Sequence, residues 1–330
     1  ESCGTRGRAP FESILSHGFV VDGKGLKMSK SLGNVIAPED ILKKYGADIL
    51  RIWVASSNYA EDLRIDYSIL DQHSESYRKI RNTFRYLLGN LNDSFEEMNY
   101  ESIKIDQLPE LEQFMLHKIY SLNLKFRKSF QDYDFHNLYK ELLNFCTVDL
   151  SAFYFDIRKD VLYCDPKDSK KRKSTLVLLN IILNSLLKWF APILSFTTEE
   201  IYQLISKRNK SIHLEKFINF PKKFENNELN NKWSQIIKIR DICNLSIEEK
   251  RASKEIGSSL EADLEINLND KLYTLTQNID FAELCITSKS SVKKNTRDEI
   301  LVETKKANGS KCPICWKITI EKCKRPSCPI

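Results

Sequence analysis

Residues 176–190, LVLLNIILNSLLKWF, constrain the fold most, because apolar side chains surround nearly the whole helical wheel. A helix of this kind is stable in water only where other elements cover it on all sides. Pro192 follows and is expected to end or kink the helix. The sequence therefore predicts a bundle of helices with residues 176–190 as its buried member.

The stretch that begins near Asp71 supplies a covering helix. Its apolar residues recur at spacings of three and four, which places them on one face. They are Tyr77, Ile80, Phe84, Leu87 and Leu91. Further helices are predicted at residues 109–130, 134–155, 174–190 and 197–206. In the last of these, Thr197 precedes Glu200 by three residues, and we interpret this pair as a helix cap rather than as catalytic residues.

The pattern changes after the polar linker at residues 220–231. Residues 232–256 read as one more helix. Residues 262–268, ADLEINL, then alternate polar and apolar side chains with period two, which indicates a half-buried strand. Further strands are predicted at 282–287 and 299–304. Together these elements predict a small α/β unit.

Composition and charge limit the possible partners. The chain has 330 residues, 51 of them basic and 45 acidic, with a net charge of +6, which permits a polyanionic partner without requiring one. We find no apolar run long enough for a membrane span and no signal peptide, and we expect a cytoplasmic protein. Because the chain begins at Glu1 and not at Met, we expect it to be a piece of something longer.

Residues 25–34, GLKMSKSLGN, place Lys27 and Lys30 three positions apart between glycines. A strand at 19–26, with a hairpin signal at its Asp-Gly pair, precedes them, and a helix with Pro38 in its first turn follows. Lysine ammonium groups on a loop suit a strongly anionic ligand, and glycines permit loop movement. The alternative is an ordinary solvated turn.

Four cysteines crowd the C-terminus, whereas the others are scattered, as suits reduced thiols. Cys312 and Cys315 form a Cys-x2-Cys pair, the recurrent arrangement that directs two thiolates at one tetrahedral zinc ion. Cys323 and Cys328 are candidates to complete a closed, structural site. The alternative is a tail of unliganded thiols.

Basic residues follow a second face of the helix near Asp71. Arg78, Arg81 and Arg85 share this face, and residues 170–173, KKRK, add another patch. Neutralising phosphates with such groups supplies most of the sequence-independent affinity for RNA. For any single residue, a solvated helix face is an equally good interpretation.

Residues 17–57, HGFVVDGKGLKMSKSLGNVIAPEDILKKYGADILRIWVASS, resemble the KMSKS signature loop of the class I aminoacyl-tRNA synthetases that charge isoleucine, valine and leucine. The resemblance implies that ATP, with Mg²⁺, is the anion. It implies that Lys30 contacts ATP and Lys27 assists. Met28, Ser29 and Ser31 would shape the loop.

Longer strings resemble the isoleucine-charging members more than the valine- or leucine-charging ones. They include LRIWVASSNYAEDLRID, YRKIRNTFRYLLGNL, DLSAFYFDIRKDVLYCD and APILSFTTEEIY. The resemblance implies isoleucine, ATP and tRNA(Ile) as partners and a monomer. It also implies a C-terminal zinc module in which Trp316 stacks on an RNA base or packs over the metal. The second cysteine pair departs from the family spacing, because it is Cys-x4-Cys.

The predicted fold is therefore mainly α, with four parts. Residues 1–70 are the end of a Rossmann-like catalytic domain with the lysine loop, and 71–225 a helical-bundle anticodon-binding domain. Residues 226–305 are the small α/β unit, and 306–330 the zinc module. The family's histidine-rich motif and editing domain are absent, so we expect this chain alone to be inactive. Two alternatives remain: a valine-charging enzyme, and a non-catalytic tRNA-binding protein derived from a synthetase.

Overall fold

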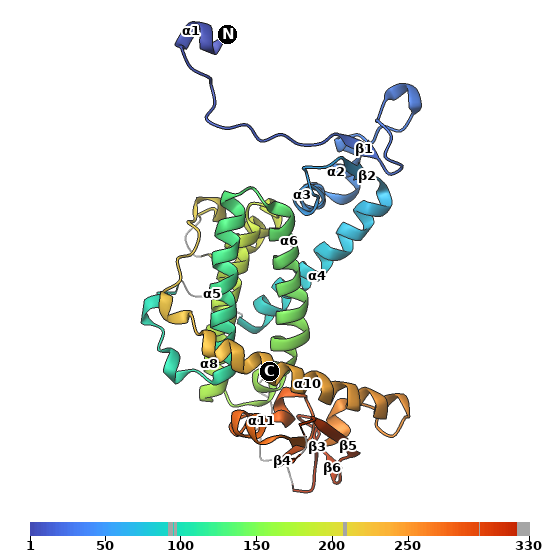
Figure 1. The fold of residues 1–330 in the computed structure, drawn as a ribbon, viewed down its shortest axis with the longest axis vertical. Coiled ribbons are helices and arrows are strands. Elements are labelled where there is room, and N and C mark those ends of the chain that lie inside the picture. Colours follow the sequence, from blue (N-terminus) through green and yellow to red (C-terminus); the bar gives the residue numbers. More distant parts are fainter. Residues whose placement is uncertain (92–94, 96–97, 207–209, 297, 322–330) are drawn as a thin grey trace. The chain divides into compact units, whose positions relative to one another are not determined.

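The structure, a computed structural model, describes residues 1–91, 95, 98–206, 210–296 and 298–321. It is mainly helical, as predicted (Figure 1). The chain divides into two compact units. Unit 1 comprises Glu1–Asn82, Lys125–Asn144 and Leu187–Phe217; unit 2 comprises Thr83–Leu124, Phe145–Leu186 and Ile218–Ile330. Three long helices contribute residues to both units, namely α4 (Tyr67–Leu91), α5 (Glu110–Gln131) and α8 (Lys170–Phe190).

The N-terminal part of unit 1 positions the lysine loop. Strand β1 (Val20–Asp22) pairs in parallel with β2 (Leu63–Ile65). Between them lie a 3₁₀ turn, η1 (Lys30–Leu32), and the helices α2 (Pro38–Tyr45) and α3 (Ala47–Ser56). The side chains that close the core here are Ile41, Ile49, Trp53, Ile65 and Leu70. The predicted helix start at Pro38 is confirmed, with Gly46 directly after the last helical residue.

The remaining elements of unit 1 are α1 (Ser2–Arg6), α6 (Phe135–Asn144), α9 (Ser195–Ile205) and the 3₁₀ turn η6 (Ile212–Leu214). The predicted cap at Thr197 is wrong, because α9 begins two residues earlier. The carboxylate of Asp48, on α3, instead accepts hydrogen bonds from the backbone N–H groups of Phe196 (3.3 Å) and Thr197 (2.8 Å). A side chain from another helix therefore satisfies the first turn of α9.

Unit 2 contains the other helices. They are the π-helix η5 (Phe145–Phe155), α7 (Asp156–Cys164), α10 (Asn227–Ala252), α11 (Asp270–Leu275) and α12 (Phe281–Leu284), with 3₁₀ turns at Tyr100–Ser102, Ile105–Gln107, Lys222–Phe224 and Ser259–Glu261. The predicted helix at 134–155 is thus α6 followed by η5. The predicted burial of residues 176–190 is confirmed along α8, where Leu178, Ile182 and Leu186 are fully buried.

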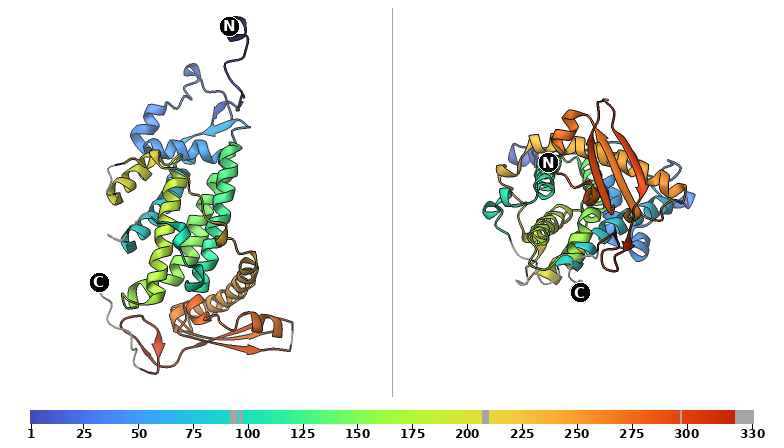
Figure 2. Two further views of the ribbon diagram at one scale, coloured as in Figure 1. Left: turned by 90° about the vertical axis from the view of Figure 1, so that its left-hand side faces the viewer. Right: turned by 90° about the horizontal axis from the view of Figure 1, so that it is seen from below.

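A small sheet completes unit 2. Strand β3 (Ala262–Leu268) lies between β4 (Lys289–Lys294), which is parallel to it, and β5 (Leu301–Lys306), which is antiparallel. Burial along β3 alternates as predicted, and α10 packs against the sheet (Figure 2). A short hairpin, β6 (Ser310–Lys311) with β7 (Ile318–Thr319), follows.

The strand predicted at 282–287 is wrong. These residues include most of α12, whose first turn is capped by Asp280: its carboxylate accepts hydrogen bonds from the N–H groups of Ala282 (2.9 Å) and Glu283 (3.1 Å). A short apolar run is compatible with either structure, and the cap decides for the helix. Within the described ranges, none of the helices is long and apolar enough to cross a membrane.

Candidate functional site

The lysine loop leaves β1 through a tight turn. The N–H of Gly25 donates to the carbonyl of Asp22 (2.9 Å), and Val21 forms an isolated antiparallel bridge with Lys27. Lys30 then opens the 3₁₀ turn η1. Both lysine side chains are exposed, so the loop presents two ammonium groups to solvent three residues apart.

The other predicted loop residues shape this backbone. The Ser29 hydroxyl caps η1 by accepting a hydrogen bond from the N–H of Leu32 (3.3 Å), and it lies 3.2 Å from the Ser31 hydroxyl. Met28 is half-buried and packs on the core that α2 and α3 form. The loop is therefore anchored at Met28 between the two lysines.

Glycine has a second role here besides permitting movement. Gly25 and Gly33 have φ angles of 82° and 67°, in the left-handed region that side chains disfavour. Gly33 ends η1, and its N–H donates to the Lys30 carbonyl (3.2 Å). The flanking glycines therefore set the loop conformation itself.

Two residues with no predicted role in the site hold the loop: Asp22, predicted only as part of a hairpin turn, and Asn34. The carboxylate of Asp22 accepts hydrogen bonds from the N–H groups of Lys24 (3.0 Å) and Leu26 (2.8 Å), and from the side-chain amide of Asn34 (2.8 Å). The Asn34 hydrogen bond is the largest cause that lowers the pKa of Asp22, followed by the bond from Leu26. The sequence feature that could have indicated this role is the position of a polar side chain at each end of the lysine loop.

The predicted RNA-binding arginines all lie on α4 and are exposed. Arg78 forms an ion pair with Glu75 (2.7 Å), and Arg81 donates to the hydroxyl of Tyr77 (3.0 Å), which raises the pKa of Arg81. Arg85 lies one helical turn beyond Arg81. These arginines are therefore available to an anionic ligand at the helix surface.

The KKRK patch is partly engaged within the protein. Lys171 forms an ion pair with Glu283 (2.7 Å), and the guanidinium of Arg172 donates to the carbonyl of Asp165 (2.9 Å). These contacts reduce the charge that this patch offers to an outside ligand. The exposed face of α4 is the stronger candidate.

The first cysteine pair lies on the β6–β7 hairpin. The N–H of Cys312 donates to the carbonyl of Lys317 (2.8 Å), and the N–H of Ile314 points at the Cys312 Sγ (3.4 Å). The thiolate is the form of cysteine that binds metal. Cys315 is also buried, and the two cysteines belong to one buried cluster with Cys164 of α7.

This half of the predicted metal site fits a zinc ion in its donor chemistry. Cys323 and Cys328, the other two predicted ligands, lie outside the described residues. Among the residues that the structure does describe, no group of three or more His, Cys, Asp or Glu side chains is arranged to hold a metal.

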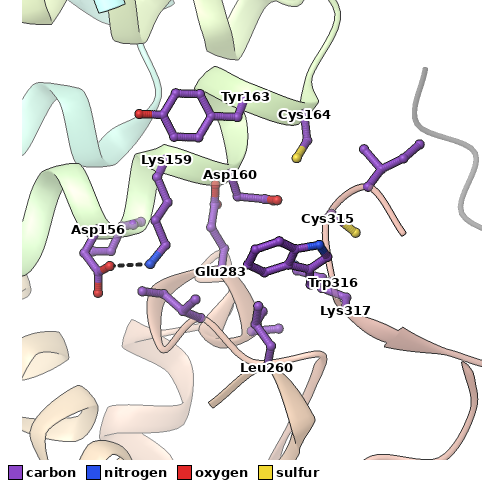
Figure 3. A pocket seen from close by; sticks show the side chains of 14 residues that line it. Asp156, Lys159, Asp160, Tyr163, Cys164, Leu260, Glu283, Cys315, Trp316 and Lys317 are labelled. Atoms are coloured by element: carbon purple, nitrogen blue, oxygen red, sulfur yellow. Dashed lines mark hydrogen bonds and ion pairs between the residues drawn. The ribbon is translucent and has the colours of Figure 1, made fainter. Parts of the chain in front are cut away.

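Trp316 follows the cysteine pair in an unusual conformation. Its φ angle is 61°, a strained value for a bulky residue, and its side chain is 60% exposed. The ammonium of Lys311 lies 5.4 Å from the ring centroid. The indole lines a cavity of about 230 Å³ together with Tyr163 and Asp160 of α7 (Figure 3). Exposed aromatic rings beside lysines suit stacking on an unpaired base.

Comparisons with known proteins match two parts of the sequence to known families. The family model for the anticodon-binding domain of tRNA ligase matches residues 112–266, and the model for class I tRNA synthetases (I, L, M and V) matches residues 2–66. The isoleucine–tRNA ligase of Pelagibacter ubique is 72% identical over 327 residues, which cover 99% of this chain and 36% of that protein. The corresponding ligase of Agrobacterium fabrum is 41% identical, over 100% of this chain and 35% of its own length.

One solved structure extends the comparison to the fold. It is the ternary complex of LeuRS, tRNA and LeuAMS from Agrobacterium radiobacter K84, which matches with a TM-score of 0.50 at 19% identity over 64% of this chain and 24% of that one. At this identity the match supports the fold alone. This chain spans about a third of the length of its curated relatives. The chain is therefore homologous to isoleucine–tRNA ligases along nearly its whole length, and its residues 2–66 match the class I tRNA synthetases of the isoleucine, leucine, methionine and valine group.

Proposed function

We propose that this chain is part of an isoleucine–tRNA ligase, which activates isoleucine with ATP to isoleucyl-adenylate and transfers it to tRNA(Ile). In this proposal the chain supplies the ATP-closing lysine loop and the surface that binds the tRNA anticodon. The observation that carries the proposal is the identity of 72% with a named isoleucine–tRNA ligase along 99% of the chain. The exposed lysine pair is consistent with it.

The chemistry explains why two lysines are needed. When a carboxylate attacks the α-phosphate of ATP, negative charge grows on the phosphate oxygens and on the departing pyrophosphate. Fixed cations aimed at that charge stabilise the transition state more than the ground state. Lys30 is proposed to contact the phosphates and Lys27 to assist. Met28, Ser29 and Ser31 hold the loop on which they stand.

We assign tRNA binding to residues beyond the lysine loop. Arg78, Arg81 and Arg85 would neutralise phosphates, and Trp316 would stack on an unpaired base. The proposed domains are 1–70 for the end of the catalytic domain, 71–225 for anticodon binding, 226–305 for the α/β unit and 306–330 for zinc. We further propose a cytoplasmic, monomeric protein.

A test of the tRNA assignment is to titrate this chain with tRNAs for isoleucine, valine and leucine at one fixed salt concentration. We expect tRNA(Ile) to bind at least about tenfold more tightly, a difference of about 1.4 kcal/mol. Replacing Arg78, Arg81 and Arg85 together by glutamine should weaken binding and reduce the slope of log K against log salt by about 2 to 3.

The matched control replaces Lys289, Lys293 and Lys305 by glutamine, which removes the same charge from ion pairs on the sheet. We expect a smaller change for this variant. Equal losses for both triple variants would contradict an arginine site on α4. A preference for valine tRNA would instead favour the valine-charging alternative.

We also propose a structural zinc ion at the C-terminal cysteines. The purified chain should carry about one zinc, because such sites gain much of their folding free energy from the metal. Replacing Cys312 and Cys315 together by serine should abolish the zinc measured by elemental analysis, whereas Cys3→Ser, at an exposed thiol near the start of the sequence, should not. A metal-free preparation that folds and binds tRNA normally would count against the site.

The second candidate function is a non-catalytic tRNA-binding protein derived from a synthetase. Exposed arginines and Trp316 serve such a protein equally well. The lysine loop favours the ligase, because a binding protein has no need of a loop that closes over ATP. The two functions differ in isoleucine-dependent exchange between ATP and pyrophosphate, which requires the ligase.

A further inference from the structure

We propose that Asp22 and Asn34 form a clamp that positions both lysines of the loop, which makes them positioning residues for the transfer of the adenylyl group. The inference rests on the proposed function for its catalytic consequence. The clamp itself rests on hydrogen bonds between side chains and backbone within residues 22–34.

Asn34 holds the backbone between the two lysines. Its Oδ1 accepts a hydrogen bond from the N–H of Ser29 (2.9 Å), and its Nδ2 donates to the carbonyl of Lys27 (3.2 Å). One side-chain amide therefore fixes two backbone groups within the short segment that joins Lys27 to Lys30. Neither bond uses an ammonium group, so both charges stay directed outwards.

Asp22 holds Asn34 in turn. Its Oδ2 accepts a hydrogen bond from the Nδ2 of Asn34 (2.8 Å). One rotamer of Asn34 therefore makes this bond together with those to Ser29 and Lys27. Its Oδ1 accepts from the N–H groups of Lys24 and Leu26, at the end of β1. The loop is thus closed at its base by two side chains 12 residues apart.

The consequence is a loop whose lysines keep their relative position while the whole segment moves. Without the clamp, the bonds to the Lys27 carbonyl and the Ser29 N–H are lost, and each lysine samples positions independently. Displacements of about 1 Å at a catalytic group lower rates by about 10²-fold. The clamp residues are therefore expected to affect catalysis without touching ATP.

The clamp is tested first in this chain by amide hydrogen exchange. In Asn34→Ala, the Ser29 amide should exchange at least about tenfold faster, because its acceptor is removed. The Leu26 amide should stay protected, since Asp22 remains. In Asp22→Ala, both amides should lose protection. Val35→Ala is the matched control, at an exposed neighbour of Asn34. An unchanged Ser29 amide in Asn34→Ala overturns the clamp.

The catalytic role is tested in a chimera, in which this chain replaces the matching part of the Pelagibacter ubique relative. Asn34→Asp places two carboxylates together, and Asp22→Asn places two amides together, so each should slow isoleucine-dependent ATP–pyrophosphate exchange by about 10²-fold in kcat. The exchanged pair, Asp22→Asn with Asn34→Asp, restores the link between the two side chains and the Ser29 bond, but not the bond to the Lys27 carbonyl. We expect it to exchange faster than either single variant and to recover part of the rate.

Recovery by the exchanged pair separates positioning from a general loss of structure. Single variants with unchanged exchange, or a double variant slower than both, overturn the positioning role. A wild-type chimera without isoleucine-dependent exchange overturns the proposed function instead. In that case the Ser29 amide still decides whether the clamp exists.

Discussion

Replacing Lys30 by alanine in the chimera is expected to slow isoleucine-dependent ATP–pyrophosphate exchange by about 10²- to 10³-fold, the range found when one fixed donor to a developing negative charge is removed. The loss should appear in kcat, because the charge that Lys30 meets grows in the transition state. Affinity for tRNA should stay nearly unchanged, since the arginines assigned to tRNA lie on α4 and not on the loop. Exchange assays and tRNA titration on one preparation measure both.

Lys24→Gln is the matched control for this prediction. It removes the same charge from an exposed lysine of the same loop, and it keeps the backbone N–H that Asp22 holds. We expect at most a small effect from it. If Lys30→Ala exchanges at the wild-type rate, or if both variants lose activity equally, a specific contact between Lys30 and ATP is contradicted.

Local signals predicted the fold where neighbouring residues decide the structure. The start of α2 follows from Pro38, whose fixed φ suits a first turn, and its end from Gly46. The strand β3 follows from strict alternation along residues 262–268. In each case the sequence window contains the physical cause.

Prediction failed where a distant or competing group decides. Thr197 looked like a cap, but Asp48, 149 residues earlier, takes the first-turn N–H groups of α9. Residues 282–287 looked like a strand, but Asp280 caps a helix there. A short stretch of sequence around Thr197 does not include Asp48. A stretch around residues 282–287 does include Asp280, but the apolar pattern there is a stronger signal than one cap.

The candidate site divides in the same way. Lys27 and Lys30 stand in a motif that can be read directly, and both are exposed on the loop as expected. The sequence predicts Asp22 only as part of a hairpin turn and predicts no role for Asn34, because their partners are backbone atoms that come within reach only after the loop folds. Their polar side chains at the two ends of a glycine-rich turn are nevertheless a usable signal for a clamp.

Arg158→Ala is expected to lower the free energy of unfolding by about 3–5 kcal/mol, the cost of leaving a buried charge without its partner. Arg158 is 2% exposed and lies on α7, and it forms two bonds to the fully buried carboxylate of Glu112, at 2.6 and 2.7 Å. Burial is the largest single cause and lowers the pKa of Arg158, but the charge and hydrogen bonds of Glu112, together with Tyr154 and Glu283, raise it above the ordinary value.

The other contacts of Arg158 and its partners show why the loss of Arg158 affects Glu112 more than Glu283. The hydroxyl of Tyr154 donates to Glu112 (3.0 Å), and burial followed by the Glu112 charge raises the pKa of Tyr154, so it stays a donor. Glu283 has Lys171 as a second partner besides Arg158. Removing Arg158 therefore leaves Glu283 paired and Glu112 with neutral donors.

Lys159→Ala supplies the matched control, because the neighbouring residue on α7 pairs with Asp156 at the surface, where both side chains are more than a third exposed. A pair of this kind contributes less than about 1 kcal/mol. Urea unfolding followed by circular dichroism compares the two variants.

The double variant Arg158→Met with Glu112→Leu decides the cause of the loss. It removes both charges and fills their space with apolar side chains of similar volume, so it should be much more stable than Arg158→Ala alone. Arg158→Met alone keeps the stem volume but leaves the Glu112 carboxylate unpaired, so if it is as stable as the double variant, the loss in Arg158→Ala comes from packing of the arginine stem and not from the unpaired carboxylate. Arg158 would then hold α5 and α7 together by shape, and charge would contribute little.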